Sequence, residues 1–174
     1  MEPIIAITIG IASSFVSSFL FLRTMKKLKP KIEISHTISK YVDENNRRVY
    51  VIKILNKGKR EAININIVFH VVKEIIVSGG RIFRSERLEL RSNNILSIPK
   101  FCKKDSDANY AFRIRCFENL EAKWSSNKNS YLRIRLTAAD AISGATIVCE
   151  QKYYTLDSIK EGQFEWGDSF KIIK

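Results

Sequence analysis

Arginine occupies every second position in two segments of this sequence, an arrangement that suits the recognition of phosphate. The first segment carries Arg113 and Arg115, and the second carries Arg133 and Arg135. Successive side chains of an extended strand point to opposite faces, so each pair of arginines shares one face of its strand. The planar guanidinium group donates two parallel hydrogen bonds to phosphate oxygens. If the two segments are neighbouring strands, the four arginines form a phosphate-binding grid.

Further residues close to these segments fit the same ligand. Tyr131 lies on the arginine side of its strand, where its ring can stack on a base, and Lys103 and Lys104 add positive charge in a predicted loop. Two interpretations stay open at this point. The arginines bind a nucleotide or a single-stranded oligonucleotide, or they form a solvated face and pair with glutamates across strands.

Metal-binding and catalytic chemistry are not expected from the remaining residues. His36 and His70 have no Cys, Asp or Glu at the spacing of metal ligands. The sequence contains no P-loop, no G-x-S-x-G and no H-E-x-x-H motif. Cys102 has no identifiable base beside it. We therefore expect no metal, no cofactor and no enzymatic activity.

The composition describes one folded domain with a strong positive charge. Of the 174 residues 45% are apolar, and 30 Lys and Arg against 18 Asp and Glu give a net charge of +12. This apolar share supports a packed core and excludes disorder as the main state. The positive charge indicates an anionic partner, such as phospholipid or nucleic acid. The three cysteines include no C-x-x-C pair, which favours a reducing compartment.

Residues 1–22 are predicted to form a transmembrane helix. The twenty residues Pro3–Leu22 carry no charge, and as a helix they are ~30 Å long, the thickness of the hydrocarbon core of a bilayer. A cleaved signal peptide begins with basic residues and ends at small residues, whereas this segment begins Met-Glu-Pro and ends Phe-Leu-Phe-Leu. A retained anchor is therefore the prediction.

A basic linker, residues 23–31, follows the predicted span. It carries Arg23, Lys26, Lys27, Lys29 and Lys31, while only Glu2 precedes the span. The positive-inside rule then places the N-terminus outside and the C-terminal part in the cytoplasm of a bacterial inner membrane. The five cations are expected to contact lipid headgroups. Without these cations and Glu2, 25 Lys and Arg stand against 17 Asp and Glu, so most of the charge belongs to the rest of the chain.

One side of the predicted helix consists of small residues. The stripe is Ala6, Gly10, Ser14 and Ser18, with Ser13 and Ser17 beside it. Small residues at a spacing of four let membrane helices approach closely, and serines can hydrogen-bond across the contact. Either the helix is a lone anchor that tolerates these residues, or it packs in a homo-oligomer whose serines line a narrow pore.

Residues 32–174 are predicted to form a cytoplasmic antiparallel β-sandwich. Apolar and polar residues alternate in short runs separated by turn-rich links such as Asp43–Asn46 and Lys103–Asn109. About eight strands at this spacing, without a long helical pattern, are typical of a sandwich. The expected strands cover 31–38, 49–55, 62–72, 81–90, 95–98, 110–117, 131–138 and 146–154.

The C-terminal stretch resembles the end of the cytoplasmic domain of inward-rectifier potassium channels. The residues that carry the resemblance are Leu136–Asp140, Ser143-Gly144, Tyr153–Ile159, Gly162, Phe164 and Trp166-Gly167. The resemblance implies an immunoglobulin-like sandwich beneath the membrane and favours a tetramer. It does not extend to potassium selectivity, because the chain has one predicted span and no T-x-G-Y-G filter.

One short span joined to a basic sandwich is also similar to the small bacterial membrane effectors of anti-phage systems, of which the Hailong type is an example. That resemblance implies an oligomeric channel in antiviral defence that a bound single-stranded DNA oligomer controls. The residues alone also allow an anchored binding module that recruits a protein partner and forms no channel.

Overall fold

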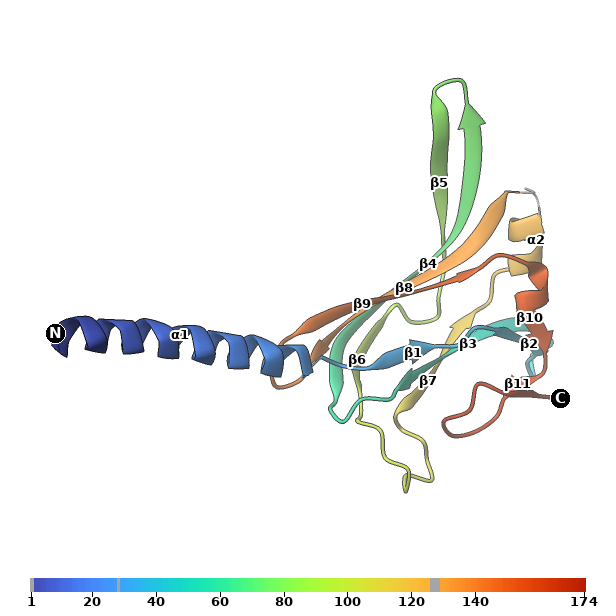
Figure 1. Ribbon diagram of the computed structural model, residues 1–174. Helices are drawn as coiled ribbons and strands as arrows, with labels where there is room; N and C mark the ends of the chain where they lie inside the picture. The colour runs from blue at the N-terminus through green and yellow to red at the C-terminus, as the bar shows by residue number, and fades with distance from the viewer. Residues whose placement is uncertain (1, 28, 126–128) are drawn as a thin grey trace.

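The chain consists of one long N-terminal helix and one β-rich domain (Figure 1). The computed structural model describes residues 2–27, 29–125 and 129–174. Helix α1, Glu2–Lys27, extends away from the domain. Its segment Pro3–Thr24 has a mean hydropathy of 2.1 and no residue buried, so it is long and apolar enough to cross a bilayer. An N-terminal signal sequence shares these two properties.

The domain contains two larger sheets, and sheet A is built around strand β3. Its strands are β1 (Ile32–Ile34), β2 (Ile38–Val42), β3 (Arg48–Asn56), β7 (Ala111–Cys116) and β10 (Ile159–Glu161). β1, β2 and β7 all pair with β3 in the antiparallel direction. β10 pairs with β2 in the parallel direction.

Sheet B is built around the longest strand, β4. Its strands are β4 (Ala62–Val77), β5 (Gly80–Leu88), β6 (Asn94–Ile98), β8 (Ser130–Asp140) and β9 (Thr146–Tyr153). The order β5-β4-β8-β9 is antiparallel throughout, and β6 pairs with the first part of β4.

The two sheets enclose a common hydrophobic core. Ile52 and Ile54 of β3 face Phe69 of β4 and Ile134 of β8, and all four side chains are buried. Burial alternates along β8 because every second side chain points into the core. The prediction of a mainly β, antiparallel sandwich with one N-terminal helix is therefore confirmed. The immunoglobulin-like topology stays a prediction.

Two local expectations differ from the structure. The strand expected at 31–38 is split into β1 and β2 at Ser35, whose hydroxyl donates to the Thr37 carbonyl oxygen and whose carbonyl accepts from the Tyr153 hydroxyl. Residues 120–125 form a short helix, α2 (Leu120–Ser125), which the period-two pattern did not indicate. Trp124 of α2 is buried and donates its indole N–H to the Ser130 carbonyl.

The C-terminal residues cover the outer face of sheet A. After a short 3-10 turn, η1 (Leu156–Ser158), the strands β11 (Gln163–Phe164) and β12 (Ile172–Ile173) pair as a hairpin. Phe164 packs on Val49 and Val51 of β3. The hairpin therefore buries a face of sheet A that a two-sheet sandwich leaves in solvent.

Candidate anion-binding face

The structure places the two arginine pairs in different sheets. β7, with Arg113 and Arg115, pairs with β3 in sheet A, whereas β8, with Arg133 and Arg135, pairs with β4 and β9 in sheet B. The two strands are therefore not neighbours, and the four arginines do not form the grid that the sequence suggested. The two strands carry the same local pattern, and pattern alone does not determine which strands pair.

Arg113 holds the C-terminal hairpin. Its Nη2 donates to the carbonyl oxygen of Phe164 at 3.2 Å, and its guanidinium lies 4.7 Å from the ring centroid of Trp166. Burial, and to a lesser degree the neighbouring Arg115, lower the pKa of Arg113 below its usual range. These contacts occupy the guanidinium, so Arg113 is a structural residue.

Arg115 is exposed and lies beside a second group of arginines. Together with Arg47, Arg91 and Phe117 it lines a cavity of about 530 Å³ at the edge of sheet A. Arg47 is ion-paired with Asp43 at 3.0 Å and lies over the Phe117 ring. The cavity therefore contains both acidic and basic groups, and its net attraction for an anion is smaller than its arginines alone suggest.

A continuous row of basic side chains crosses the outer face of sheet B. The pairing register sets four residues side by side on four neighbouring strands: Arg87 of β5, His70 of β4, Arg133 of β8 and Lys152 of β9. Directly opposed residues point to the same face of a sheet, and strands lie about 4.8 Å apart, so the row is about 15 Å long. We call these four residues the basic row.

The electrostatics of His70 reflect its position in the row. Burial lowers the pKa of His70 below its usual value, and the charges of Arg133, Arg87 and Arg135 lower it further. Within the described residues, neither Arg87 nor Arg133 lies within 4.0 Å of a carboxylate. The two guanidinium groups of the row therefore have no ion-paired carboxylate among the described residues, whereas Lys152 lies 3.4 Å from Glu150.

Arg135 fits the other interpretation made from the sequence. It donates to Glu150 Oε2 at 2.7 Å from the next strand, and this hydrogen bond is the main reason that the pKa of Glu150 is lowered. Lys152 also reaches Glu150, at 3.4 Å. One arginine of β8 thus pairs across strands while its neighbour Arg133 does not.

Two tyrosines lie beside the basic row. The ring centroids of Tyr131 and Tyr154 are 5.5 Å apart, and Lys152 Nζ lies 5.7 Å from the centroid of the Tyr131 ring. Tyr154 is 66% exposed, so its ring is open to a stacking partner. Proteins that bind single-stranded nucleic acids combine aromatic rings with cations in this way.

Lys103 and Lys104 lie away from this face. They are exposed in the loop that leads to β7, and this loop contacts the C-terminal hairpin through the Trp166 indole N–H, which donates to the Ser106 carbonyl at 2.8 Å. The structure places them on the side of sheet A, so they do not join Arg133 and Tyr131.

The small-residue stripe of α1 lies along the exposed surface of the helix. Ser13 and Ser14 both donate their hydroxyl groups to the Gly10 carbonyl oxygen, at 3.0 and 2.9 Å, so these hydroxyls are satisfied within the helix. A depression of about 380 Å³ follows the stripe. Its lining includes Gly10, Ser14 and Ser18, whereas Ala6, Ser13 and Ser17 stand beside it. The stripe therefore favours the close approach of a second helix by its shape, because the hydroxyl groups of Ser13 and Ser14 are already hydrogen-bonded.

The juxtamembrane cations are described in part. The helix continues past the predicted span, so Arg23 lies in its final turns and is exposed, and Lys29 and Lys31 are exposed after it. Lys31 lies 3.7 Å from Glu33. The side chains of Lys26 and Lys27 lie outside the described part of the structure, as does residue 28 of the predicted linker.

The remaining polar candidates do not assemble into a site. Among the described residues, no three His, Cys, Asp or Glu side chains gather closely enough to hold a metal ion. Cys102 is exposed, Cys149 is half-buried, and Cys116 is buried with its thiol pKa raised to about 11 by desolvation. The expectation that the chain is not an enzyme stays a prediction.

Sequence reasoning identified Arg133 and Tyr131 but missed His70, Arg87 and Lys152. Each of the three lies on a strand that the sequence predicted, and each is a basic residue, which is a visible signal. Their alignment with Arg133 depends on the register of three strand pairs, each of which joins residues more than 15 positions apart in sequence. No pattern within a single strand contains that information.

Comparisons with known proteins do not assign this chain to a family. No family model and no curated protein matches the sequence. Among solved structures, the chain is similar to the crystal structure of Spo0M, sporulation control protein, from Bacillus subtilis, with a TM-score of 0.34 and 7% sequence identity. The similarity covers 72% of this chain and 48% of that chain, so this chain matches about half the length of that protein.

Proposed function

We propose that this protein is a single-pass membrane protein whose cytoplasmic sandwich binds a phosphate-bearing ligand, a single-stranded oligonucleotide or a nucleotide, on the outer face of sheet B. The observation that carries the proposal is the basic row, in which Arg87, His70, Arg133 and Lys152 lie side by side on four strands. Two of its guanidinium groups have no carboxylate partner in the described residues. The positive charges of this row repel one another, and a bound anion would relieve the repulsion.

The shape of the face favours an extended polyanion. The row crosses the whole width of the sheet, and the side chains of His70, Arg133 and Lys152 are half-exposed, so successive phosphates of one strand can contact successive cations. Tyr131 and Tyr154 at one side of the row offer rings on which bases stack. A single-stranded oligonucleotide uses both features, and a mononucleotide uses only part of them.

The helix supports the second half of the proposal, a membrane effector that acts as an oligomer. In this proposal the span Pro3–Thr24 anchors the chain in a bacterial inner membrane. The cations that follow it support a cytoplasmic position of the sandwich under the positive-inside rule. The depression along Gly10 and Ser14 lets a second helix approach closely. Ligand binding on the sandwich then controls how the helices associate and whether they form a pore, as the resemblance to anti-phage effectors implies.

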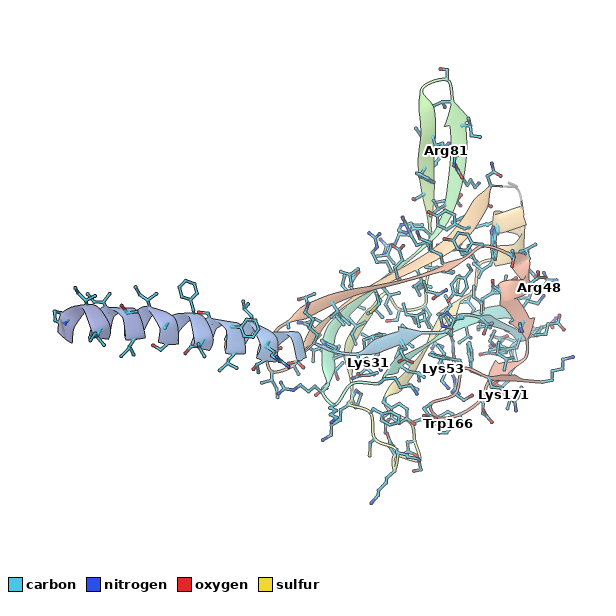
Figure 2. The ribbon with its side chains drawn as sticks, viewed as in Figure 1. Lys31, Arg48, Lys53, Arg81, Trp166 and Lys171 are labelled. Atoms are coloured by element: carbon cyan, nitrogen blue, oxygen red, sulfur yellow. The ribbon has the colours of Figure 1, made fainter. Side chains whose placement is uncertain are left out.

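Binding of a fluorescent oligothymidylate to the detergent-solubilised full chain tests the ligand half. We expect Arg133→Ala to weaken binding about ten-fold or more, since a charge-assisted hydrogen bond contributes about 1.5–3 kcal/mol. The slope of log affinity against log salt concentration should also become about 0.7 shallower for each lost phosphate contact. Arg48→Ala is the matched control, because Arg48 is an exposed arginine of sheet A (Figure 2). Equal losses for both variants, or binding insensitive to salt, contradict the proposal.

Conductance or growth toxicity tests the oligomer half. Gly10→Leu fills the depression on α1, while Ile5→Leu leaves the volume of an exposed residue unchanged and serves as the control. A pore-forming assembly loses activity only with Gly10→Leu. Retention of function by Gly10→Leu would instead favour an anchored module that recruits a protein partner.

A further inference from the structure

The hairpin formed by β4 and β5 extends beyond the sandwich into solvent (Figure 1). β4 pairs with β8 as far as Lys73, and the Glu74 N–H still donates to the Asn129 carbonyl oxygen at 2.9 Å. From Ile75 to the turn at Ser78 and Gly79, the strand pairs with β5. Gly80, at a φ of +136°, closes this turn with backbone that other residues rarely adopt. Residues 74–83 therefore form a two-stranded ribbon, which we call the free hairpin.

The free hairpin carries exposed apolar side chains on both of its faces. The pairing register sets Ile75 opposite Ile82 on one face, and Phe83 opposite Glu74 on the other, where Ile76 also lies. Ile76 is 71% exposed and Phe83 is 61% exposed. A ribbon that packs on one layer needs only one apolar face. On this ribbon, a partner on either side would bury exposed apolar side chains.

Its strand edge is also unsatisfied. β5 is the terminal strand of sheet B, and all but the last of its nine residues are exposed. An isolated two-stranded ribbon is marginally stable in water, and a long exposed apolar edge strand is a site of association. The two charged residues of the free hairpin are paired with each other, since Arg81 contacts Glu74 at 3.0 Å.

The direction of the free hairpin relative to α1 indicates which kind of molecule can cover it. Figure 1 shows the hairpin rising from the sandwich across the direction of α1, and Figure 2 shows Arg81 near its tip, far from the helix. When α1 spans the bilayer along its normal, the hairpin runs parallel to the membrane surface. The molecules held at that same height by an identical anchor are other copies of this chain.

We propose that the free hairpin is the contact through which a second copy of this chain docks beside the first in the plane of the membrane. The proposal rests on the anchoring of α1 in the proposed function, and it does not rest on the ligand. It supplies a cytoplasmic contact between subunits in addition to any contact between helices. A contact between the hairpin of one copy and a different surface of its neighbour is heterologous, so it repeats from subunit to subunit and closes into a ring where the rotation between neighbours permits closure.

The test is the mass of the full chain in detergent, measured by light scattering. The variant Ile76→Ser with Phe83→Ser removes apolar surface from the hairpin, and Leu96→Ser with Ile142→Ser removes similarly exposed apolar surface elsewhere, at 84% and 78% exposure. We expect at least a two-fold decrease in mass for the hairpin variant and the wild-type mass for the control. An unchanged mass of the hairpin variant, or a monomeric wild type, overturns the proposal.

A second measurement separates protein contact from lipid contact. In Phe83→Trp, the new indole should emit at shorter wavelength in the assembled protein and should not be quenched by brominated lipid in reconstituted vesicles. Strong quenching would mean that the hairpin inserts into the bilayer, which also overturns the proposal. The hairpin variant should bind oligothymidylate with wild-type affinity, so failure of this proposal is distinguishable from failure of the ligand site.

Discussion

Arg133 on β8 lies directly opposite His70 on β4, on the outer face of sheet B. The positive charge of Arg133 is the largest of the nearby charges that depress the pKa of His70, after burial. The imidazole of His70 lies between two guanidinium groups, which favour its neutral form while no anion is bound. The pair therefore connects the strand register to the proposed ligand.

Oligonucleotide binding should tighten as the pH falls. In the free protein the pKa of His70 lies below its usual value of about 6.5. A bound phosphate favours the imidazolium, so binding raises this pKa and takes up a proton. Between pH 8 and pH 5.5 we expect the affinity of the wild type to rise by up to about ten-fold for each pKa unit of the change, and that of His70→Gln to follow a flatter profile. Identical pH profiles for the two proteins would remove His70 from the site.

Lys53 should make the stability of the fold rise with pH in the alkaline range. It is fully buried beneath the C-terminal hairpin, where its Nζ donates to the carbonyl oxygens of Glu165 and Ser169, both at 2.7 Å. Burial, followed by the charge of Arg113, lowers its pKa to about 8 from 10.5. Between these values the unfolded chain binds the proton and the folded chain does not, so stability increases with pH by at most about 1.4 kcal/mol per pH unit.

The difference between wild type and Lys53→Met isolates this effect. Thermal unfolding of both proteins from pH 7 to pH 10 should give a difference that is constant below pH 8 and changes above it in favour of the wild type. Lys171→Met is the control, because Lys171 is exposed in the same hairpin. A difference independent of pH would contradict the account of Lys53.

Gly162 should be required for the C-terminal hairpin to dock. Its φ is +119°, and a Cβ at this position would overlap the carbonyl oxygen of Ile173 in β12. Gly162→Ala should destabilise the fold by roughly 1–3 kcal/mol and should increase hydrogen exchange across residues 163–173. Gly79→Ala is a control, since a Cβ at Gly79 meets no atom within 4 Å. Unchanged exchange in Gly162→Ala would show that the hairpin is held without this close approach.

Sequence patterns predicted the elements better than their arrangement. Alternation along Tyr131–Ala138 predicted β8, because a half-buried strand has a period of two whatever its neighbours are. The same alternation at 110–117 predicted β7 but not its sheet, and the C-terminal hairpin then covers Arg113 from a distance of about fifty residues in sequence. β11 and β12 have two residues each, too few for any periodicity to appear.

The free hairpin was predicted only in part for a related reason. The strand at 81–90 was expected from the sequence, and the structure confirms it as β5, Gly80–Leu88. The expected third strand ended at Val72, because Lys73 and Glu74 interrupt its apolar run, whereas β4 continues to Val77. Hydrogen bonds to β5 carry the strand past that point, and apolar residues beyond it lie in solvent.

The location of the bound oligonucleotide tests the central claim most directly. Photo-crosslinking of a 5-iodouracil-substituted oligothymidylate to the full chain, followed by peptide mapping, identifies the rings that the bases touch. We predict attachment within residues 130–154, at Tyr131 or Tyr154 beside the basic row. Attachment confined to the loop of Lys103 and Lys104 or to the cavity around Arg115 would contradict the assignment of sheet B as the binding face.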